Sequence, residues 1–469
     1  MTELLSQASD FICGYPLFLL LIGGGLFFLF YSGFAPLKYY WYALKLVGKE
    51  EKSAVKKEGQ ISPFEALMSV IAANVGMGNI AGVAIALTMG GPGAIFWMWV
   101  SSVVGMATKF FEGSLSVMYR RVDKDGVPRG GTMYMIEEGL GRRWKPMAVF
   151  FAVMGLVGTL CIMQSNQLTE AILTIVSSGE AIGSSAFLSM IGGAIGCDND
   201  MVIRILCGVV IGAIVAAVIF GGITRIGKIS ARMVPVMVVL YFLIVLYIIF
   251  TNLSVVPDVF ASIFRGAFSL EAGIGGIVGV AVIGARRAAL INEAGTGTGT
   301  MMHGASTNTD PTREGLNAMI GPSVDSGFLC TLTALAVLIK GDYNVEGIKG
   351  LEIVLKAFDA GVPGLGSPLF MVVVLFFAFS TMFSYSYYGQ KCTAYLFGEK
   401  WARYYNYPYL LVIIIAAVIP LSAAVSIIDI AYALMALPTM IAMFILAPRA
   451  RSAMKDYFAG KNTSSKCIK

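Results

Sequence analysis

The sequence predicts an all-α integral membrane protein with about eleven transmembrane helices, built as a 5+5 inverted repeat after one extra N-terminal helix. Of its 469 residues, 57% are hydrophobic and 13% are charged, whereas soluble domains carry about 25% charged residues. Apolar runs of roughly 20 residues recur along the chain, and each can cross about 30 Å of hydrocarbon as a helix. A closed β-barrel would alternate apolar and polar residues, so the spans are predicted to be helical.

Eleven apolar runs define the predicted spans. The first lacks a basic N-terminal region and precedes a lysine-rich segment, so we expect a retained helix rather than a cleaved signal peptide. The predicted spans are 15–37, 62–89, 93–119, 147–176, 201–221, 232–252, 268–290, 315–340, 367–396, 407–424 and 427–448.

The basic residues predict the orientation of the chain in the membrane. With the N-terminus outside, 28 of the 34 Lys and Arg residues face the cytoplasm, in segments 38–60, 120–146, 222–232, 286–313, 391–403 and 449–469. Cytoplasmic loops are enriched in these residues, so we expect a multi-pass protein of the cell membrane with its C-terminus inside. The net charge of +6 therefore reflects topology in the lipid bilayer and predicts no nucleic-acid partner.

The ten spans after the first divide into two blocks of five. This division predicts an extra helix and linker in 1–61, repeats in 62–252 and 253–448, and a cytoplasmic tail in 449–469. Because five is odd, the second repeat starts from the opposite face of the membrane. The lead spans of both repeats are rich in glycine, at 75–78 and at 273–279. Discontinuous helices at matching positions are typical of secondary transporters with a site at the midplane.

The first interruption lies between Asn74 and Asn79, in the sequence NVGMGN. Glycine costs about 1 kcal/mol in a helix interior, and an unpaired amide in hydrocarbon costs several times more. An unwound turn exposes carbonyls suited to a cation and N–H groups suited to a carboxylate. The alternative is a packing seam of small residues, which does not account for two asparagines.

Other spans carry polar groups at a similar depth. One helix face combines Phe377, Ser380, Thr381 and Ser384, whose hydroxyls either bind an alkali cation or bond back to their own helix. Another span supplies the neutral amides of Gln164, Asn166 and Gln167, either to the site or as hydrogen bonds between helices.

Charged residues within or near the spans have several interpretations. Asp325 is nearest a midplane and would be a cation ligand, a proton carrier or the partner of an arginine. Lys109 and Glu112, three residues apart, are expected to pair with each other as gate or structural residues. Arg286 and Arg287 are interpreted as topology anchors or inner-gate partners.

Two further features are predicted to have no functional role. The run GTGTGT at 295–300 lacks the lysine of a phosphate loop, so we expect a flexible turn at the inner end of a helix. His303 follows it in a cytoplasmic loop. The seven cysteines are scattered, and with a single histidine they support neither a disulfide framework nor a metal site.

Several stretches resemble the alanine or glycine:cation symporter family. They are NIAGVA at 79–84, GGPGAIFWMW at 90–99, GMATKF at 105–110, NEAG at 292–295, Asp325, CT at 330–331, FAFST at 377–381 and YYG at 387–389. The resemblance covers essentially the whole chain, and it implies a leucine-transporter-like fold.

The resemblance also implies a substrate site at the first interruption. Its substrate-binding residues would be Asn74, Met77, Gly78, Asn79, Gln164, Gly275, Gly276, Ile277 and Tyr385. The amides of Met77 and Gly78 would hold the substrate carboxylate, and the second interruption would close over the substrate side chain. Family members usually have threonine in place of Met77 and tryptophan in place of Tyr385. The resemblance therefore predicts the fold and the coupling to an ion more closely than the identity of the substrate.

The same resemblance implies one sodium site beside the substrate. Its ligands would be the carbonyls of Ala72, Val75 and Phe377 and the hydroxyls of Ser380 and Thr381. Asn79 and Asp325 are further candidates for ligands of Na⁺.

We therefore expect a symporter that imports a small neutral amino acid, alanine or glycine, with co-transported Na⁺ by alternating access. Two alternatives stay open, namely coupling to protons through Asp325 and transport of another small neutral amino acid such as serine or glutamine. A channel is disfavoured because four chains normally build such a filter around one axis. We do not expect an enzyme, because the sequence predicts no intramembrane histidine or paired acids for acid–base chemistry.

Overall fold

The computed structural model describes residues 7–8, 11–49, 59–122, 127–177, 199–268, 273–340, 343–344, 350–419 and 421–460. Within these ranges the regular structure is helical, apart from an antiparallel pair of two-residue strands. Eight described helices are long and apolar enough to cross a membrane, and two bent helix pairs raise the number to ten. The predicted all-helical membrane fold is thus confirmed. The remaining predicted span, 407–424, corresponds to the short helix α24 (Asn406–Ala416) and the first residues of α25, which begins at Leu421.

The N-terminal region forms one bent span. Its helical part ends near Gly33 and Phe34, which both have positive φ, and the chain turns by 79° into the next helix. The elements, with η marking short 3-10 and π turns, are α2 (Tyr15–Phe18), η1 (Leu19–Gly23), α3 (Gly24–Tyr31) and α4 (Ala35–Leu46).

The chain then forms the first broken helix and the elements that follow it. These are α5 (Pro63–Asn74), η2 (Gly78–Gly82), α6 (Val83–Gly90), α7 (Gly93–Met118), β1 (Arg121–Val122), β2 (Pro128–Arg129), α8 (Thr132–Leu140), η3 (Arg142–Trp144), α9 (Lys145–Gly158), α10 (Ile162–Ser177), α13 (Asn199–Ile219) and α14 (Gly222–Phe250).

The rest of the chain contains the second broken helix and the elements that pack around it. These are α15 (Val256–Ala267), α16 (Gly273–Asn292), α17 (Gly299–His303), α18 (Pro311–Ala318), α19 (Ile320–Pro322), η5 (Ser323–Leu329), α20 (Cys330–Lys340), α21 (Leu351–Gly361), α22 (Gly366–Phe397), α23 (Glu399–Ala402), η6 (Arg403–Tyr405), α24 and α25 (Leu421–Phe458).

The first broken helix is interrupted where the sequence predicts. Ser62 and Glu65 form a reciprocal capping box at the start of α5, with Pro63 in the first turn. The helix ends at Asn74, because Val75 is extended with ψ 95°, and α6 continues at 57° to α5. The side-chain oxygen of Asn79 accepts a hydrogen bond from the Gly76 N–H at 3.0 Å, which stabilises the unwound turn.

The second broken helix is interrupted at a different place from the predicted one. Helix α16 runs without a break through 273–279, and the chain unwinds only at 293–298, before α17. The prediction that Gly275 to Gly279 form the break is therefore wrong. Gly275 and Gly279 have open space around the position of a Cβ, so these glycines mark a helix surface and not an unwound turn.

The run at 295–300 is a buried turn, and not a flexible loop at the inner end of a helix. Gly295 and Gly297 have φ of 92° and 86°, which L residues rarely adopt. Their N–H groups donate to the same Glu112 carboxylate oxygen at 2.7 and 3.2 Å. The turn is ordered because a buried carboxylate satisfies its freed backbone donors.

The structure corrects the predicted position of His303 and shows where Arg286 and Arg287 lie in the fold. Arg286 and Arg287 lie within α16, before the break, and their role as topology anchors or inner-gate partners stays a prediction. His303 is fully buried at the end of α17, where its Nδ1 lies 2.6 Å from Glu314 Oε1, so it is not part of an exposed loop.

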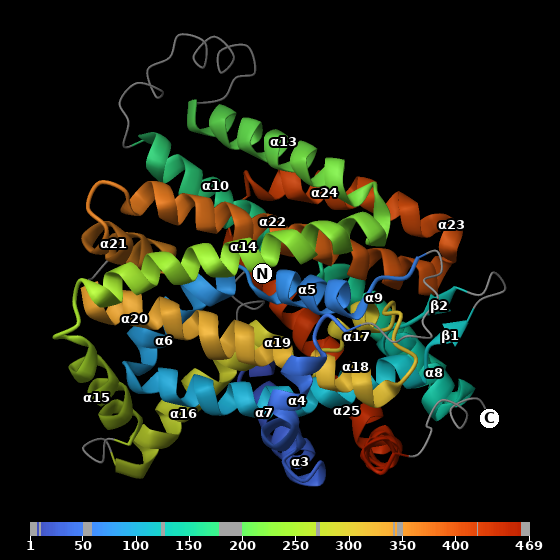
Figure 1. Ribbon diagram of the computed structural model, residues 1–469. Coiled ribbons are helices and arrows are strands. Elements are labelled where there is room, and N and C mark those ends of the chain that lie inside the picture. Colours follow the sequence, from blue (N-terminus) through green and yellow to red (C-terminus); the bar gives the residue numbers. More distant parts are fainter. Residues whose placement is uncertain are drawn as a thin grey trace.

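Most of the long helices run roughly along one another, whereas α3 and α15 cross this direction steeply (Figure 1). Helix α8 and the β1–β2 hairpin lie at one end, whereas α15 and α21 lie at the other (Figure 1). The residues that precede α5 and follow α17 are also joined. Ile61 accepts from Thr307 N–H at 2.9 Å and donates to the Ala305 carbonyl at 3.0 Å, which ties the two broken helices together at one end.

Candidate functional site

A cavity of about 400 Å³ lies between the two breaks. Elements α5, η2, α6, α9, α10, α16, α22 and α25 contribute to its wall. The lining residues are Ala73, Asn74, Gly76, Met77, Gly78, Gly82, Ile85, Gly158, Leu160, Met163, Gln164, Gln167, Arg287, Leu290, Ile291, Glu293, Thr381, Tyr385, Ile428, Asp429 and Tyr432. A mainly apolar wall with a few convergent polar groups is typical of a small-molecule site.

The structure brings five of the predicted substrate-site residues to this cavity. They are Asn74, Met77, Gly78, Gln164 and Tyr385. Asn79 lies behind the wall, where its amide nitrogen donates to the Asp325 carbonyl at 3.2 Å. Its contacts brace the first break from within the protein.

Three predicted substrate-site residues do not reach the cavity. Gly275, Gly276 and Ile277 are absent from its lining, and Gly275 is exposed. They lie in the first turns of α16, whereas the break that faces the cavity follows Asn292. The shift of the second break along the chain therefore displaces this part of the predicted site.

Beside the cavity, five oxygens from α5, from the unwound turn that follows it and from α22 converge. The Ser380 hydroxyl lies 3.3 Å from the Val75 carbonyl and 3.0 Å from the Phe377 carbonyl. The Thr381 hydroxyl lies 3.4 Å from the Ala72 carbonyl and 3.1 Å from the Phe377 carbonyl. Helical spacing in the sequence places Phe377, Ser380 and Thr381 on one face of α22 together with Ser384, but Ser384 is not part of this cluster. The contact of Ser380 and Thr381 with Val75 and Ala72 depends on the fold.

Gly76 is required at this junction for a steric reason. A Cβ built on Gly76 would lie 2.6 Å from the Thr381 hydroxyl oxygen. The close approach of the unwound turn to α22 therefore excludes any side chain at this position.

Asp325 is fully buried behind the first break, and it is not part of the cavity wall. The Asn74 amide nitrogen donates to its Oδ2 at 3.1 Å and to the Asn292 carbonyl at 3.0 Å. Asn74 thus links the first break to the end of α16. Its amide oxygen is buried and has no hydrogen-bond partner among the described residues.

The amides of α10 divide between the two interpretations that the sequence left open. Asn166 connects helices, since its nitrogen donates to the carbonyls of Ala416 and Ile419 at 3.1 and 2.9 Å. Gln164 and Gln167 instead line the cavity.

Lys109 and Glu112 form the predicted ion pair, with Nζ and Oε2 3.1 Å apart and both side chains buried. The pair supports the second break, because Glu112 accepts from Gly295 and Gly297 and Lys109 donates to the Glu293 carbonyl at 3.0 Å. Its role in the described structure is to hold the unwound turn of the second broken helix.

Sequence reasoning missed three polar residues of the cavity, namely Glu293, Asp429 and Tyr432. The sequence predicts a cytoplasmic position for segment 286–313, and this position gives Glu293 no role in a site at the midplane. A signal was present in the sequence, since both breaks consist of an asparagine followed by two glycines separated by one residue, Asn74-Val-Gly-Met-Gly and Asn292-Glu-Ala-Gly-Thr-Gly.

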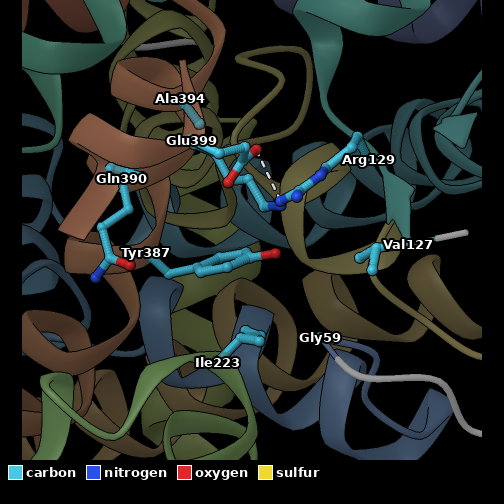
Figure 2. A pocket seen from close by; sticks show the side chains of 10 residues that line it. Gly59, Val127, Arg129, Ile223, Tyr387, Gln390, Ala394 and Glu399 are labelled. Carbon is cyan, nitrogen blue, oxygen red and sulfur yellow. Dashed lines mark ion pairs between the residues drawn. The ribbon is translucent and has the colours of Figure 1, made fainter. Parts of the chain in front are cut away.

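A second cavity, of about 150 Å³, lies between α22, α14, β2 and α23 (Figure 2). Arg129 and Glu399 form an ion pair of 2.7 Å across it. The Tyr387 hydroxyl points toward the side that holds Arg129 and Val127 (Figure 2), and it has no hydrogen-bond partner in the described chain. The residues of α22 that line this cavity begin at Tyr387, six residues after Thr381. They are therefore separated from Thr381 by at least about 9 Å along the helix axis.

Comparison with known proteins places these features in a family context. A family model described as the sodium:alanine symporter family matches residues 1–468. The sodium/alanine symporter AgcS of Methanococcus maripaludis is 35% identical over 454 residues, which are 95% of this chain and 94% of that protein. The probable sodium/glutamine symporter GlnT of Bacillus subtilis is 30% identical over 459 residues, with coverage of 97% and 91%.

A further relative and a solved structure also match most of the chain. An uncharacterised transporter of Haemophilus influenzae is 35% identical over 464 residues, with coverage of 97% and 96%. The crystal structure of MhsT in complex with L-phenylalanine matches with a TM-score of 0.59 at 13% identity, over 85% of this chain and 93% of that chain. At this identity the match concerns the fold alone, and it confirms the predicted leucine-transporter-like fold.

Proposed function

This chain belongs to the sodium:alanine symporter family, a family of transporters and not of enzymes, and from that premise we propose that it imports alanine or glycine together with Na⁺. The observation that carries the proposal is the cluster of five oxygens on Ala72, Val75, Phe377, Ser380 and Thr381, directly beside the cavity.

The spacing of these oxygens fits an alkali cation. Oxygen ligands lie about 2.4 Å from a hard cation of the size of Ca²⁺ or Na⁺, and two such ligands at right angles are about 3.4 Å apart. The four oxygen–oxygen distances in the cluster lie between 3.0 and 3.4 Å. All five ligands are neutral, so the site would carry one net positive charge when Na⁺ is bound, which lets the membrane potential drive entry by about 2.3 kcal/mol per 100 mV.

The substrate carboxylate would bind at the restart of the first broken helix. Met77 and Gly78 line the cavity at the point where the helix resumes, and the N-terminus of a helix segment offers free N–H groups and a positive dipole end. Gly78 also lets the substrate carboxylate approach the backbone closely, because no side chain covers its amide.

The size of the cavity favours a second candidate substrate. About 400 Å³ leaves room beyond a methyl side chain, and Gln164 and Gln167 line its wall. A longer neutral amino acid such as serine or glutamine would fill this space and bond to these amides. A relative named as a probable sodium/glutamine symporter supports this candidate.

Transport would proceed by alternating access. We propose that the repeats 62–252 and 253–448 form the two halves, and that α5, α6, α16 and α17 rock together with their partners to open the cavity to one side at a time. The N-terminus would lie outside the cell membrane and the C-terminus inside, so the cavity of Arg129 and Glu399 would face the cytoplasm.

A competition panel tests the substrate. Purified protein is reconstituted in proteoliposomes with an inward sodium gradient, and unlabelled amino acids compete with labelled alanine. We expect alanine and glycine to compete most strongly, and competition by serine or glutamine at lower concentrations would favour the second candidate. Absence of any alanine uptake at all would contradict the proposed substrates.

A further inference from the structure

We propose that Glu293 is the ammonium-binding residue of the cavity and that it restricts transport to substrates with a free, protonated amino group. The inference rests on the proposed function, because it assigns one end of the proposed zwitterionic substrate. It adds a charged partner to a site whose other proposed contacts are neutral.

The backbone of Glu293 is held so that its side chain faces the cavity. Glu293 follows α16 with φ 52°, one of two described non-glycine residues with positive φ. Its carbonyl accepts from Lys109 Nζ at 3.0 Å and from the Thr296 hydroxyl at 2.8 Å. Residues held in such a sparsely populated conformation cluster at ligand-binding sites, where surrounding contacts fix them.

The carboxylate of Glu293 is held by neutral donors. The Tyr385 hydroxyl donates to Oε1, and the Thr298 hydroxyl donates to Oε2 at 2.6 Å. Tyr385 is in turn bonded to Tyr432 at 3.0 Å. These contacts orient the carboxylate without supplying a positive charge.

Within the described chain, no Lys or Arg forms an ion pair with the Glu293 carboxylate. Lys109, the nearest cation in the network, pairs with Glu112 and contacts only the backbone of Glu293. An unpaired charge inside a membrane is costly and marks a substrate or ion pathway, and the cation of a ligand is the partner that the cavity can offer to this carboxylate.

The position of Glu293 matches the geometry of an amino acid. The first break offers Met77 and Gly78 to a carboxylate, and the second break offers Glu293, both on the same cavity. The two ends of a zwitterion would thus bind to the two broken helices. A hydroxy acid such as lactate has the carboxylate but leaves Glu293 without a partner, and this loss is the basis of discrimination.

The test compares alanine with lactate as inhibitors of labelled alanine uptake in proteoliposomes. In the wild type we expect alanine to bind at least about 30-fold more tightly than lactate, the range typical of a buried charge pair that loses one member. Glu293→Gln should weaken the binding of alanine and so remove most of this ratio. The binding of lactate should change less than about threefold. Glu293→Asp keeps the charge and should restore part of the ratio.

The control is Glu352→Gln on α21, which removes an exposed carboxylate paired with Lys356 at 3.4 Å. It should leave the alanine-to-lactate ratio unchanged. A Glu293→Gln variant with an unchanged ratio, or one that weakens alanine and lactate equally, would overturn the inference, because a structural role predicts no selective effect.

The wild type alone also decides the question if the variants do not fold. Equal inhibition by lactate and alanine in the wild type would overturn the inference without any variant. A wild type without sodium-dependent alanine uptake would instead contradict the proposed function, so the two failures are distinguishable.

Discussion

The Thr381 hydroxyl donates a hydrogen bond of 3.4 Å to the Ala72 carbonyl, and so connects α22 to the last turn of α5 across 309 residues of sequence. This contact joins the second repeat to the unwound turn of the first. In the proposed mechanism it is also an edge of the sodium site, so cation binding would hold the two halves together.

Removing the Thr381 hydroxyl is expected to weaken sodium binding. Thr381→Ala deletes one of five proposed ligands, and hydrogen bonds to a charge contribute about 1.5–3 kcal/mol, so half-maximal activation should need at least about tenfold more sodium. The measurement is alanine uptake against sodium concentration in proteoliposomes. Ser367→Ala, at a half-buried position on the same helix whose hydroxyl contacts Asp359, is the matched control. Wild-type sodium activation in Thr381→Ala would show that the cation site is elsewhere.

A methyl group at Gly76 is expected to abolish transport. Its Cβ would lie 2.6 Å from the Thr381 hydroxyl, so the unwound turn and α22 would have to separate. Gly275→Ala is the matched control, because open space surrounds that position and alanine favours a helix by about 1 kcal/mol over glycine. Uptake rates of the two variants, normalised to protein in the membrane, check this prediction. Loss of transport in Gly275→Ala as well would show that the effect at Gly76 does not depend on its contact with Thr381.

Neutralising Glu112 is expected to destabilise the fold. Glu112→Gln leaves Lys109 buried without its counter-charge, and breaking such a pair costs about 3–5 kcal/mol. The double variant Lys109→Met with Glu112→Gln removes both charges and should recover part of this loss. Thermal unfolding of the detergent-solubilised protein measures both. If the double variant loses as much stability as the two single variants together, Lys109 and Glu112 do not stabilise the fold by direct pairing.

The two cavities are expected to open to opposite sides of the membrane. In a cysteine-free background, a membrane-impermeant maleimide should label Ile85→Cys of the larger cavity from outside and Gln390→Cys of the smaller cavity from inside. Glu399→Gln removes the partner of Arg129 and should speed labelling of Gln390→Cys. Labelling of both positions from the same side would contradict the proposed orientation.

The sequence predicts the first break correctly because its signal is local. Two glycines and two asparagines inside an apolar run are unfavourable in a continuous helix, and Val75 is indeed extended there. The stripe of Ser380 and Thr381 follows from helical spacing in the same way.

The second break was misplaced because its stabilising partners are distant in sequence. Glycine density at 273–279 suggested an interruption, but these glycines lie on a continuous helix. The polar run after Asn292 unwinds inside the protein because Glu112 and Lys109, on α7, satisfy its backbone. Only the fold shows that this run is buried, and with it the position of Glu293 in the cavity.

The most direct test of sodium coupling is accumulation of labelled alanine in proteoliposomes under a sodium gradient, compared with choline and with a proton gradient at matched membrane potential. The proposal predicts accumulation above the external concentration only with sodium, and its collapse when an ionophore dissipates the sodium gradient. Equal accumulation with choline under a proton gradient would contradict sodium coupling.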